Sequence, residues 1–247
     1  MFTSFIYGLI ASSGLFIGAY LGIHFNFKKI TNACIMAFGS GVLIATLACE
    51  LMEEAYKRAN GAFHIVTLGF IVGGAAFVLL DYIVDILGGA HRKHKKSMRA
   101  KALANDKAIA LGALLDGIPE AIVIGIGVAQ NKGLGLIMLI AVLLNNIPEG
   151  ISGVHGLKNA EKSQKFMFSL WTLITAACAI SAVFGYAKFQ NASPLVISLS
   201  LSLAAGSILA MVSETLIPEA LDEGGRRVTM FLLLGFLVIF ELSHLVG

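Results

Sequence analysis

Two closely similar phrases place a proline directly before a glutamate inside apolar stretches of the sequence. They are LLDGIPEAI at 114–122 and LLNNIPEGI at 143–151. Asp116 lies four residues before Glu120, and Asn145 lies four residues before Glu149, so each pair shares one face of a helix. Proline also removes the backbone hydrogen bond to the carbonyl four residues earlier. Each phrase therefore predicts side-chain oxygens beside a freed backbone oxygen, which together are ligands suited to a cation.

The acids in these phrases need a compensating positive charge. An acid at the centre of a membrane span costs about 2.5–3.5 kcal/mol, so Asp116, Glu120 and Glu149 together cost roughly 7–10 kcal/mol. Neither stretch, 108–130 or 133–155, contains a lysine or an arginine. A bound divalent cation is the interpretation we favour, and bound protons are the alternative.

Further acids lie at the ends of other apolar stretches. Glu50 and Glu54 close one such stretch, and Glu214 and Glu219 close another. With the central acids, they predict an entrance, a centre and an exit for a cation.

The composition is that of a membrane protein. Of 247 residues, 57% are hydrophobic and 13% are charged, and the mean hydropathy is +0.84, whereas soluble domains carry about 25% charged residues. Spans of about 20 apolar residues cross a bilayer. We expect an all-α, polytopic membrane protein with a single transmembrane domain over 1–247 and no nucleic-acid partner. Its eight expected spans are 3–24, 32–52, 63–88, 108–130, 133–155, 166–188, 195–217 and 228–246.

The distribution of basic residues predicts the orientation. Loops after odd-numbered spans carry 14 of the 18 lysines and arginines, and such loops face the cytoplasm. We therefore expect a multi-pass protein of the cell membrane, with both termini outside and loop 89–107 in the cytoplasm. His91 and His94 in this loop are candidates for capturing metal.

The sequence also contains a longer internal repeat. GSGVLIATLACELMEEA at 39–55 resembles AAGSILAMVSETLIPEA at 204–220, and the alignment pairs Glu54 with Glu219. Spans one to three thus mirror spans six to eight, and span four mirrors span five. Repeats in opposite orientation are typical of secondary transporters, whose sites lie near the middle of the membrane.

The phrases DGIPEA, NNIPEG and SETLIPEA resemble the motifs of the ZIP (Zrt-, Irt-like protein) divalent-metal transporters. The resemblance covers essentially the whole chain. It implies eight spans in a 3+2+3 inverted-repeat arrangement and a dimer. It also implies movement of zinc-, manganese- or iron-like ions into the cytoplasm through a binuclear site between spans four and five. The metal is then the substrate, and we expect no permanently bound cofactor.

The resemblance assigns the ligands residue by residue. Glu120 and Glu149 match the family's metal-binding glutamates, and Asn146 matches a ligand of the second site. Asp116 and Asn145 stand where the family usually has histidine.

Two further positions of the motifs differ from the family. Cys178 stands where the family often has a glutamate that bridges the two metals, and Glu214 stands in place of a histidine in span seven. The remaining set is rich in oxygen, which suits magnesium, calcium or manganese better than zinc.

Two other functions remain open at this stage. GISG at 150–153 fits the Gly-x-Ser-Gly pattern of rhomboid intramembrane proteases, with Ser152 as nucleophile and His244 as base. That pattern is short and leaves both Pro-Glu phrases unexplained, so we predict that the protein is not an enzyme. The other alternative is a proton-linked carrier of another small solute, in which the buried acids relay protons.

Overall fold

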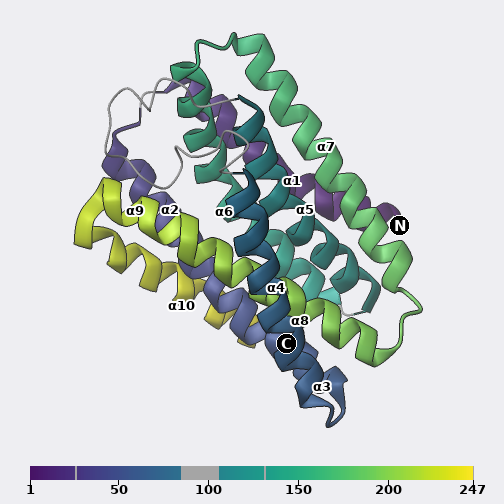
Figure 1. The fold of residues 1–247 in the computed structure, drawn as a ribbon. Coiled ribbons are helices and arrows are strands. Elements are labelled where there is room, and N and C mark those ends of the chain that lie inside the picture. Colours follow the sequence, from purple (N-terminus) through teal and green to yellow (C-terminus); the bar gives the residue numbers. More distant parts are fainter. Residues whose placement is uncertain (26, 85–105, 131, 247) are drawn as a thin grey trace.

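A computed structural model describes residues 1–25, 27–84, 106–130 and 132–246 (Figure 1). All regular elements in these ranges are helical, which confirms the expected all-α class. The α-helices are α1 (Phe2–His24), α2 (Lys29–Thr46), α3 (Glu53–Ala59), α4 (Phe63–Val84), α5 (Asp106–Gln130), α6 (Lys132–Asn159), α7 (Gln164–Phe189), α8 (Pro194–Met211), α9 (Ile217–Gly224) and α10 (Val228–Val246). Two π-helical turns, η1 (Leu47–Met52) and η4 (Val212–Leu216), and one 3₁₀ turn, η5 (Gly225–Arg227), join some of them.

Seven helical segments within the described ranges are long and apolar enough to cross a membrane. The expectation of a multi-pass membrane protein is therefore supported, but the count differs from the predicted eight. The reason lies in the last segment, Pro194–Leu245, which is helical over 52 residues and contains both of the last two expected spans. Within it, Gly225 has a positive φ of 63°, which ends α9 and starts the short turn η5 before α10.

Local sequence explains several of the helix ends. The hydroxyls of Ser163 and Ser193 accept hydrogen bonds from backbone amides in the first turns of α7 and α8, as N-cap serines do. Pro194 follows at the first position of α8, where a missing N–H costs nothing. Asn60, at the end of α3, adopts the left-handed conformation with φ 45°, which asparagine tolerates better than most residues.

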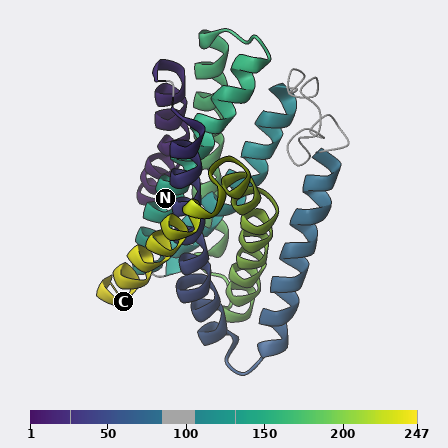
Figure 2. The same cartoon turned by 90° about the vertical axis from the view of Figure 1, so that its left-hand side faces the viewer.

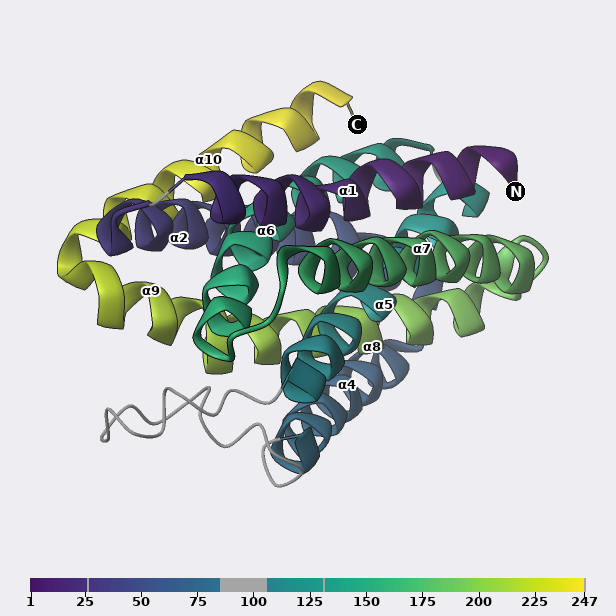
Figure 3. The same cartoon turned by 90° about the horizontal axis from the view of Figure 1, so that it is seen from above.

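The helices pack in pairs around a central layer. α1 contacts α6 and α7, and α5 contacts α6 and α7. α2 packs against α10, and α4 packs against α8. Figures 2 and 3 show α4 and α10 at opposite edges of the bundle, with α5 and α6 between them. The two Pro-Glu phrases therefore lie in its interior.

Glycines on α1 allow a close approach to α6. A Cβ atom at Gly18 would lie 2.1 Å from the carbonyl oxygen of Ile147 in α6, and one at Gly14 would lie 2.5 Å from that of Leu143. Only a glycine fits at such distances. Gly14 and Gly18 thus pack inside the protomer, where they bring the backbone of α1 against the second Pro-Glu phrase.

Matching features recur 165 residues apart. η1 begins at Leu47 and η4 begins at Val212. A Cβ atom at Gly41 would meet the carbonyl of Leu232 in α10 at 1.9 Å, and one at Gly206 would meet the carbonyl of Phe70 in α4 at 2.0 Å. The pairs aligned in the sequence repeat therefore have equivalent packing roles.

Candidate functional site

The five predicted ligands lie in the interior of the bundle. α5 continues through Pro119 and α6 continues through Pro148, so each Pro-Glu phrase lies within one helix. The exposed fractions of the five side chains range from 0% to 9%. They are Asp116, Glu120, Asn145, Asn146 and Glu149.

Glu120 and Asn145 have unusual surroundings for buried polar residues. Glu120 is 1% exposed, and neither of its carboxyl oxygens has a hydrogen-bond partner in the described part of the chain. Asn145 is fully buried, and both its amide nitrogen and its amide oxygen are likewise without a partner there. Buried polar groups are nearly always hydrogen-bonded, so such groups indicate a strained site or one that takes up an ion or water.

The three acids lie near one another without forming a closed metal shell. Glu120 interacts electrostatically with both Glu149 and Asp116. However, the described residues contain no group of three His, Cys, Asp or Glu side chains that could hold a metal ion together. A metal at this place would therefore need amide or backbone oxygens as well, or a rearrangement of the carboxylates.

Small residues of α1 and α2 form the wall next to α6. A Cβ atom at Gly39 in α2 would lie 3.2 Å from Oδ1 of Asn145. The amide of Asn146 donates a hydrogen bond of 3.1 Å to the carbonyl of Ala11 in α1. Asn146 thus uses its nitrogen to bind α1, and its oxygen has no hydrogen-bond partner among the described residues.

Cys178 reaches the site from α7. It is 1% exposed and interacts electrostatically with Glu120 and Glu149. Its sulfur lies 2.8 Å from the position that a Cβ atom at Gly117 would take. The thiol therefore fills space on the α5 face that only a glycine at 117 leaves open.

A hydrogen bond connects the central site with α9. Ser152, three residues after Glu149 and so on the same face of α6, donates a hydrogen bond of 2.8 Å to Oε1 of Glu219. Glu219 is half-buried, whereas Glu214, the other acid predicted at this end, is exposed on η4. The hydrogen bond of Glu219 thus joins α9 to α6.

At the opposite end of the bundle, a network of hydrogen bonds starts at α3. The guanidinium of Arg58 donates to Glu54 at 2.6 Å and to the amide oxygen of Gln130, at the end of α5, at 3.0 Å. Gln130 in turn donates to the carbonyl of Phe189, at the end of α7. These bonds tie α3, α5 and α7 together.

Glu50 contributes a second connection at this end. It lies in η1 and accepts a hydrogen bond from the hydroxyl of Ser243 in α10. Of the two acids predicted for the entrance, Glu50 therefore binds a residue of another helix, and Glu54 binds a residue of its own helix. The loop histidines His91 and His94 lie outside the described residues.

Sequence reasoning missed the partners of the flanking acids. Arg58 follows Glu54 by four residues, a spacing that favours an ion pair on a helix, and this signal was available. Ser152 was considered only as a nucleophile, although its spacing from Glu149 places both on one face of α6. The contact of Arg58 with Gln130 spans 72 residues of sequence, and no local pattern indicates it.

No model of a known protein family matches this chain. A search of curated proteins also finds no match. The ZIP resemblance therefore rests on the motifs themselves, and the function is inferred from the residues and their arrangement.

Proposed function

We propose that this protein is a transporter of divalent metal cations, with its substrate site between α5 and α6. The observation that carries this proposal is the buried carboxylate of Glu120, whose oxygens have no hydrogen-bond partner among the described residues. The carboxylates of Asp116 and Glu149 are close by, and no lysine or arginine occurs in 108–155 except Lys132 at the start of α6. A divalent cation supplies a positive charge beside the carboxylate of Glu120, because buried charges are stable only when they are paired or coordinate a metal.

The proposed architecture has eight crossings in a 3+2+3 arrangement. At a rise of about 1.5 Å per residue, a straight helix of the length of Pro194–Leu245 would measure roughly 78 Å, far more than the ~30 Å of a bilayer core. We therefore count α8 and α10 as two crossings joined by α9 and η5. The matched π-helical turns and the matched glycine contacts support the inverted relation of α1, α2 and α4 to α7, α8 and α10.

The proposed mechanism is alternating access. A cation enters past Glu50 and Glu54, binds the central oxygens, and leaves past Glu219. In this conformation the Arg58 network ties the entrance together, which favours a state closed at that end. Opening the entrance then requires that Arg58 leave Glu54 or Gln130, and an incoming cation competes with the guanidinium for the carboxylate.

The oxygen-rich ligand set favours manganese-like over zinc-like ions. The central candidates are three carboxylates and two amides, with one thiol from Cys178 and no imidazole. Zinc sites usually contain histidine or cysteine, whereas carboxylate and carbonyl ligands suit Mg²⁺, Ca²⁺ and Mn²⁺. Glu120 and Glu149 are the proposed main ligands, with Asp116, Asn145 and Asn146 completing one or two sites.

The proposed setting is the cell membrane, with both termini outside and the basic loops in the cytoplasm. The proposal includes import into the cytoplasm and, by the ZIP resemblance, assembly as a dimer. The structure pairs Ser152 with Glu219 rather than with a histidine, so we do not propose the protease.

Elemental analysis of cells tests this function. Cells that express the wild type are compared with cells that express Glu120→Ala plus Glu149→Ala, over a panel of Zn, Mn, Fe, Co, Ni, Cd, Mg and Ca. We expect the wild type alone to accumulate one metal, with manganese or iron favoured. Equal content of every metal, with both proteins folded and present in the membrane, would contradict the proposal.

A proton-linked carrier is the second candidate. It is favoured by one observation, the absence of a three-residue metal cluster among the described His, Cys, Asp and Glu side chains. In that case the same cells would show no metal difference, and vesicles containing the protein would acidify when a solute gradient is applied.

A further inference from the structure

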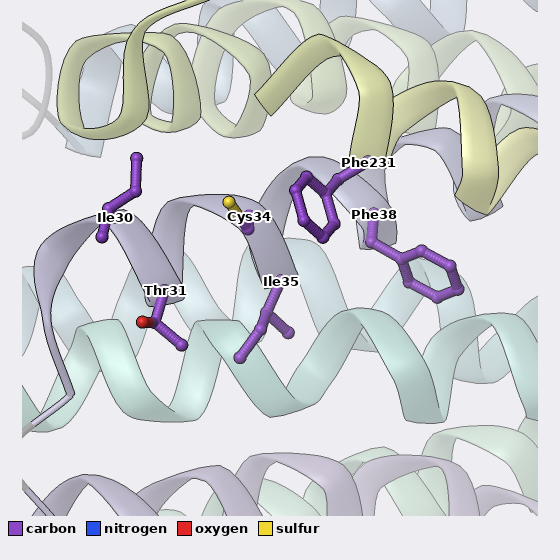
Figure 4. Close-up of a pocket in the computed structure, with 6 residues that line it drawn as sticks. All are labelled: Ile30, Thr31, Cys34, Ile35, Phe38 and Phe231. Atoms are coloured by element: carbon purple, nitrogen blue, oxygen red, sulfur yellow. The ribbon is translucent and has the colours of Figure 1, made fainter. Parts of the chain in front are cut away.

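An apolar groove lies between the first turns of α2 and α10 (Figure 4). Its volume is about 380 Å³, and it is lined by Ile30, Thr31, Cys34, Ile35 and Phe38 of α2 and by Phe231 of α10. The groove ends where the two helices meet, because a Cβ atom at Gly235 would lie 2.0 Å from the carbonyl of Phe38. No part of the proposed cation route uses this groove.

Basic residues surround the other end of the groove. Lys28 and Lys29 begin α2, and Arg226 and Arg227 precede α10; all four are exposed. The segments that carry the two pairs approach each other, since a Cβ atom at Gly224 would be 2.9 Å from the Cβ atom of Ala33 and 3.5 Å from the side chain of Ile30. Arg227 directly precedes α10, four residues before Phe231 of the groove.

The charge at this end is positive after its acids are included. Asp222 and Glu223 of α9 are the nearest acids in the sequence, so the four basic residues named above outnumber them by two. Both α2 and α10 also begin here, which adds the positive ends of two helix dipoles. A phosphate group fits this end, and a hydrocarbon chain fits the groove.

We infer that this groove binds one anionic phospholipid, with an acyl chain along Cys34 and Phe38 and the phosphate beside Lys29, Arg226 and Arg227. The predicted orientation places these basic residues at the cytoplasmic leaflet, where anionic lipids concentrate. Basic pockets between membrane helices on that side are typical sites for such head groups. This inference does not depend on the proposed cation transport.

The rate at which the Cys34 thiol is labelled measures directly whether a lipid occupies the groove. The purified full-length protein in detergent is treated with N-ethylmaleimide while phosphatidylglycerol or phosphatidylcholine with the same acyl chains is added. Labelling of Cys34 is measured by peptide mass analysis, and Cys49 in the same molecule is the internal reference. We expect phosphatidylglycerol to slow labelling of Cys34 at concentrations about tenfold lower than phosphatidylcholine does, with Cys49 unaffected.

Charge variants test the head-group end. Arg226→Gln plus Arg227→Gln should remove this preference, since each basic residue contributes roughly a factor of five to the attraction of an anionic lipid. Lys162→Gln plus Lys165→Gln, which removes the same charge from another loop on the same predicted side, should preserve it.

Three results would overturn the inference. Equal protection by phosphatidylcholine would show an apolar groove without head-group recognition. Protection by glycerol 3-phosphate alone would show a phosphate site without an acyl chain. Protection that rises with protein concentration in the absence of lipid would show that a second copy of the chain occupies the groove.

Discussion

Glu54 and Glu219 occupy matching positions after the two π-helical turns, yet their side chains have different partners. Glu54 binds Arg58 on its own helix at 2.6 Å, and Arg58 continues to Gln130 of α5. Glu219 instead accepts a hydrogen bond from Ser152 of α6 at 2.8 Å. The position that corresponds to Arg58 in the second repeat is Glu223. The two repeats therefore differ at this position, with a guanidinium on the acid of the first repeat and a serine hydroxyl on the acid of the second.

Replacing Arg58 with glutamine should open the end that its network closes. The variant loses charge-assisted hydrogen bonds worth about 1.5–3 kcal/mol each, which corresponds to roughly a tenfold or larger shift toward the open state. The measurement is the rate at which a membrane-impermeant thiol reagent, added from outside, labels the buried Cys178. Peptide mass analysis separates this label from those on Cys34 and Cys49.

Lys57→Gln is the matched control for this experiment. Lys57 also pairs with an acid four residues earlier, Glu53, but both side chains are mostly exposed, and such surface pairs contribute little. The control should label Cys178 at the wild-type rate. If Arg58→Gln does so too, the network does not close the entrance.

Replacing Ser152 with alanine separates a structural role from a nucleophilic one. The change removes one hydrogen bond between α6 and the carboxylate of Glu219, so we expect a loss of about 1.5–3 kcal/mol in the free energy of unfolding. The unfolding temperature should fall, and metal transport should be retained. Ser200→Ala, at a half-buried serine whose hydroxyl donates to the carbonyl of Val196 within its own helix, should leave both properties unchanged. Complete loss of metal transport with an unchanged unfolding temperature would contradict a purely structural role of Ser152.

A methyl group at Gly18 should disrupt the contact between α1 and α6. The new Cβ atom would lie 2.1 Å from the carbonyl oxygen of Ile147, a backbone atom that cannot rotate away. Overpacking of this kind typically costs about 1–3 kcal/mol. Thermal unfolding should show Gly18→Ala to be less stable than Gly74→Ala, whose Cβ atom would meet its nearest neighbour at an ordinary 3.4 Å. Equal unfolding temperatures would refute this packing.

Gly117 and Cys178 should behave as a coupled pair. Gly117→Ala places a methyl group 2.8 Å from the sulfur of Cys178, so we expect a loss of about 1–3 kcal/mol from overpacking. Cys178→Ala in the same chain removes the sulfur and should restore most of that loss. The coupling is measured by a double-mutant cycle of unfolding temperatures, and additive effects would show that the two residues do not meet.

The sequence predicted the all-helical class and the apolar membrane helices because their signals are local. Long apolar runs need no partner elsewhere in the chain to be recognised. The sequence predicted two separate spans at the end of the chain. It did not predict that the residues between them are also helical, so that helical structure continues from Pro194 to Leu245 with only a short turn at Gly225. The burial of Glu120 and Asn145 followed from their place in apolar stretches. The partners of Glu54 and Glu219 did not follow, since side chains on distant segments provide them.

Uptake of a divalent metal by reconstituted protein tests the central claim most directly. Purified wild type and a Glu120→Gln plus Glu149→Gln variant are placed in vesicles that hold a fluorescent metal indicator, and Mn²⁺ is added outside. Glu53→Gln, at an exposed acid on α3, is the control for loss of a negative charge. We expect saturable uptake by the wild type and the control, and a decrease of about 100-fold in the double variant, since each lost charge-assisted contact is worth about 1.5–3 kcal/mol. Uptake by the double variant at the wild-type rate, or no uptake of any divalent metal by the folded wild type, would contradict the account.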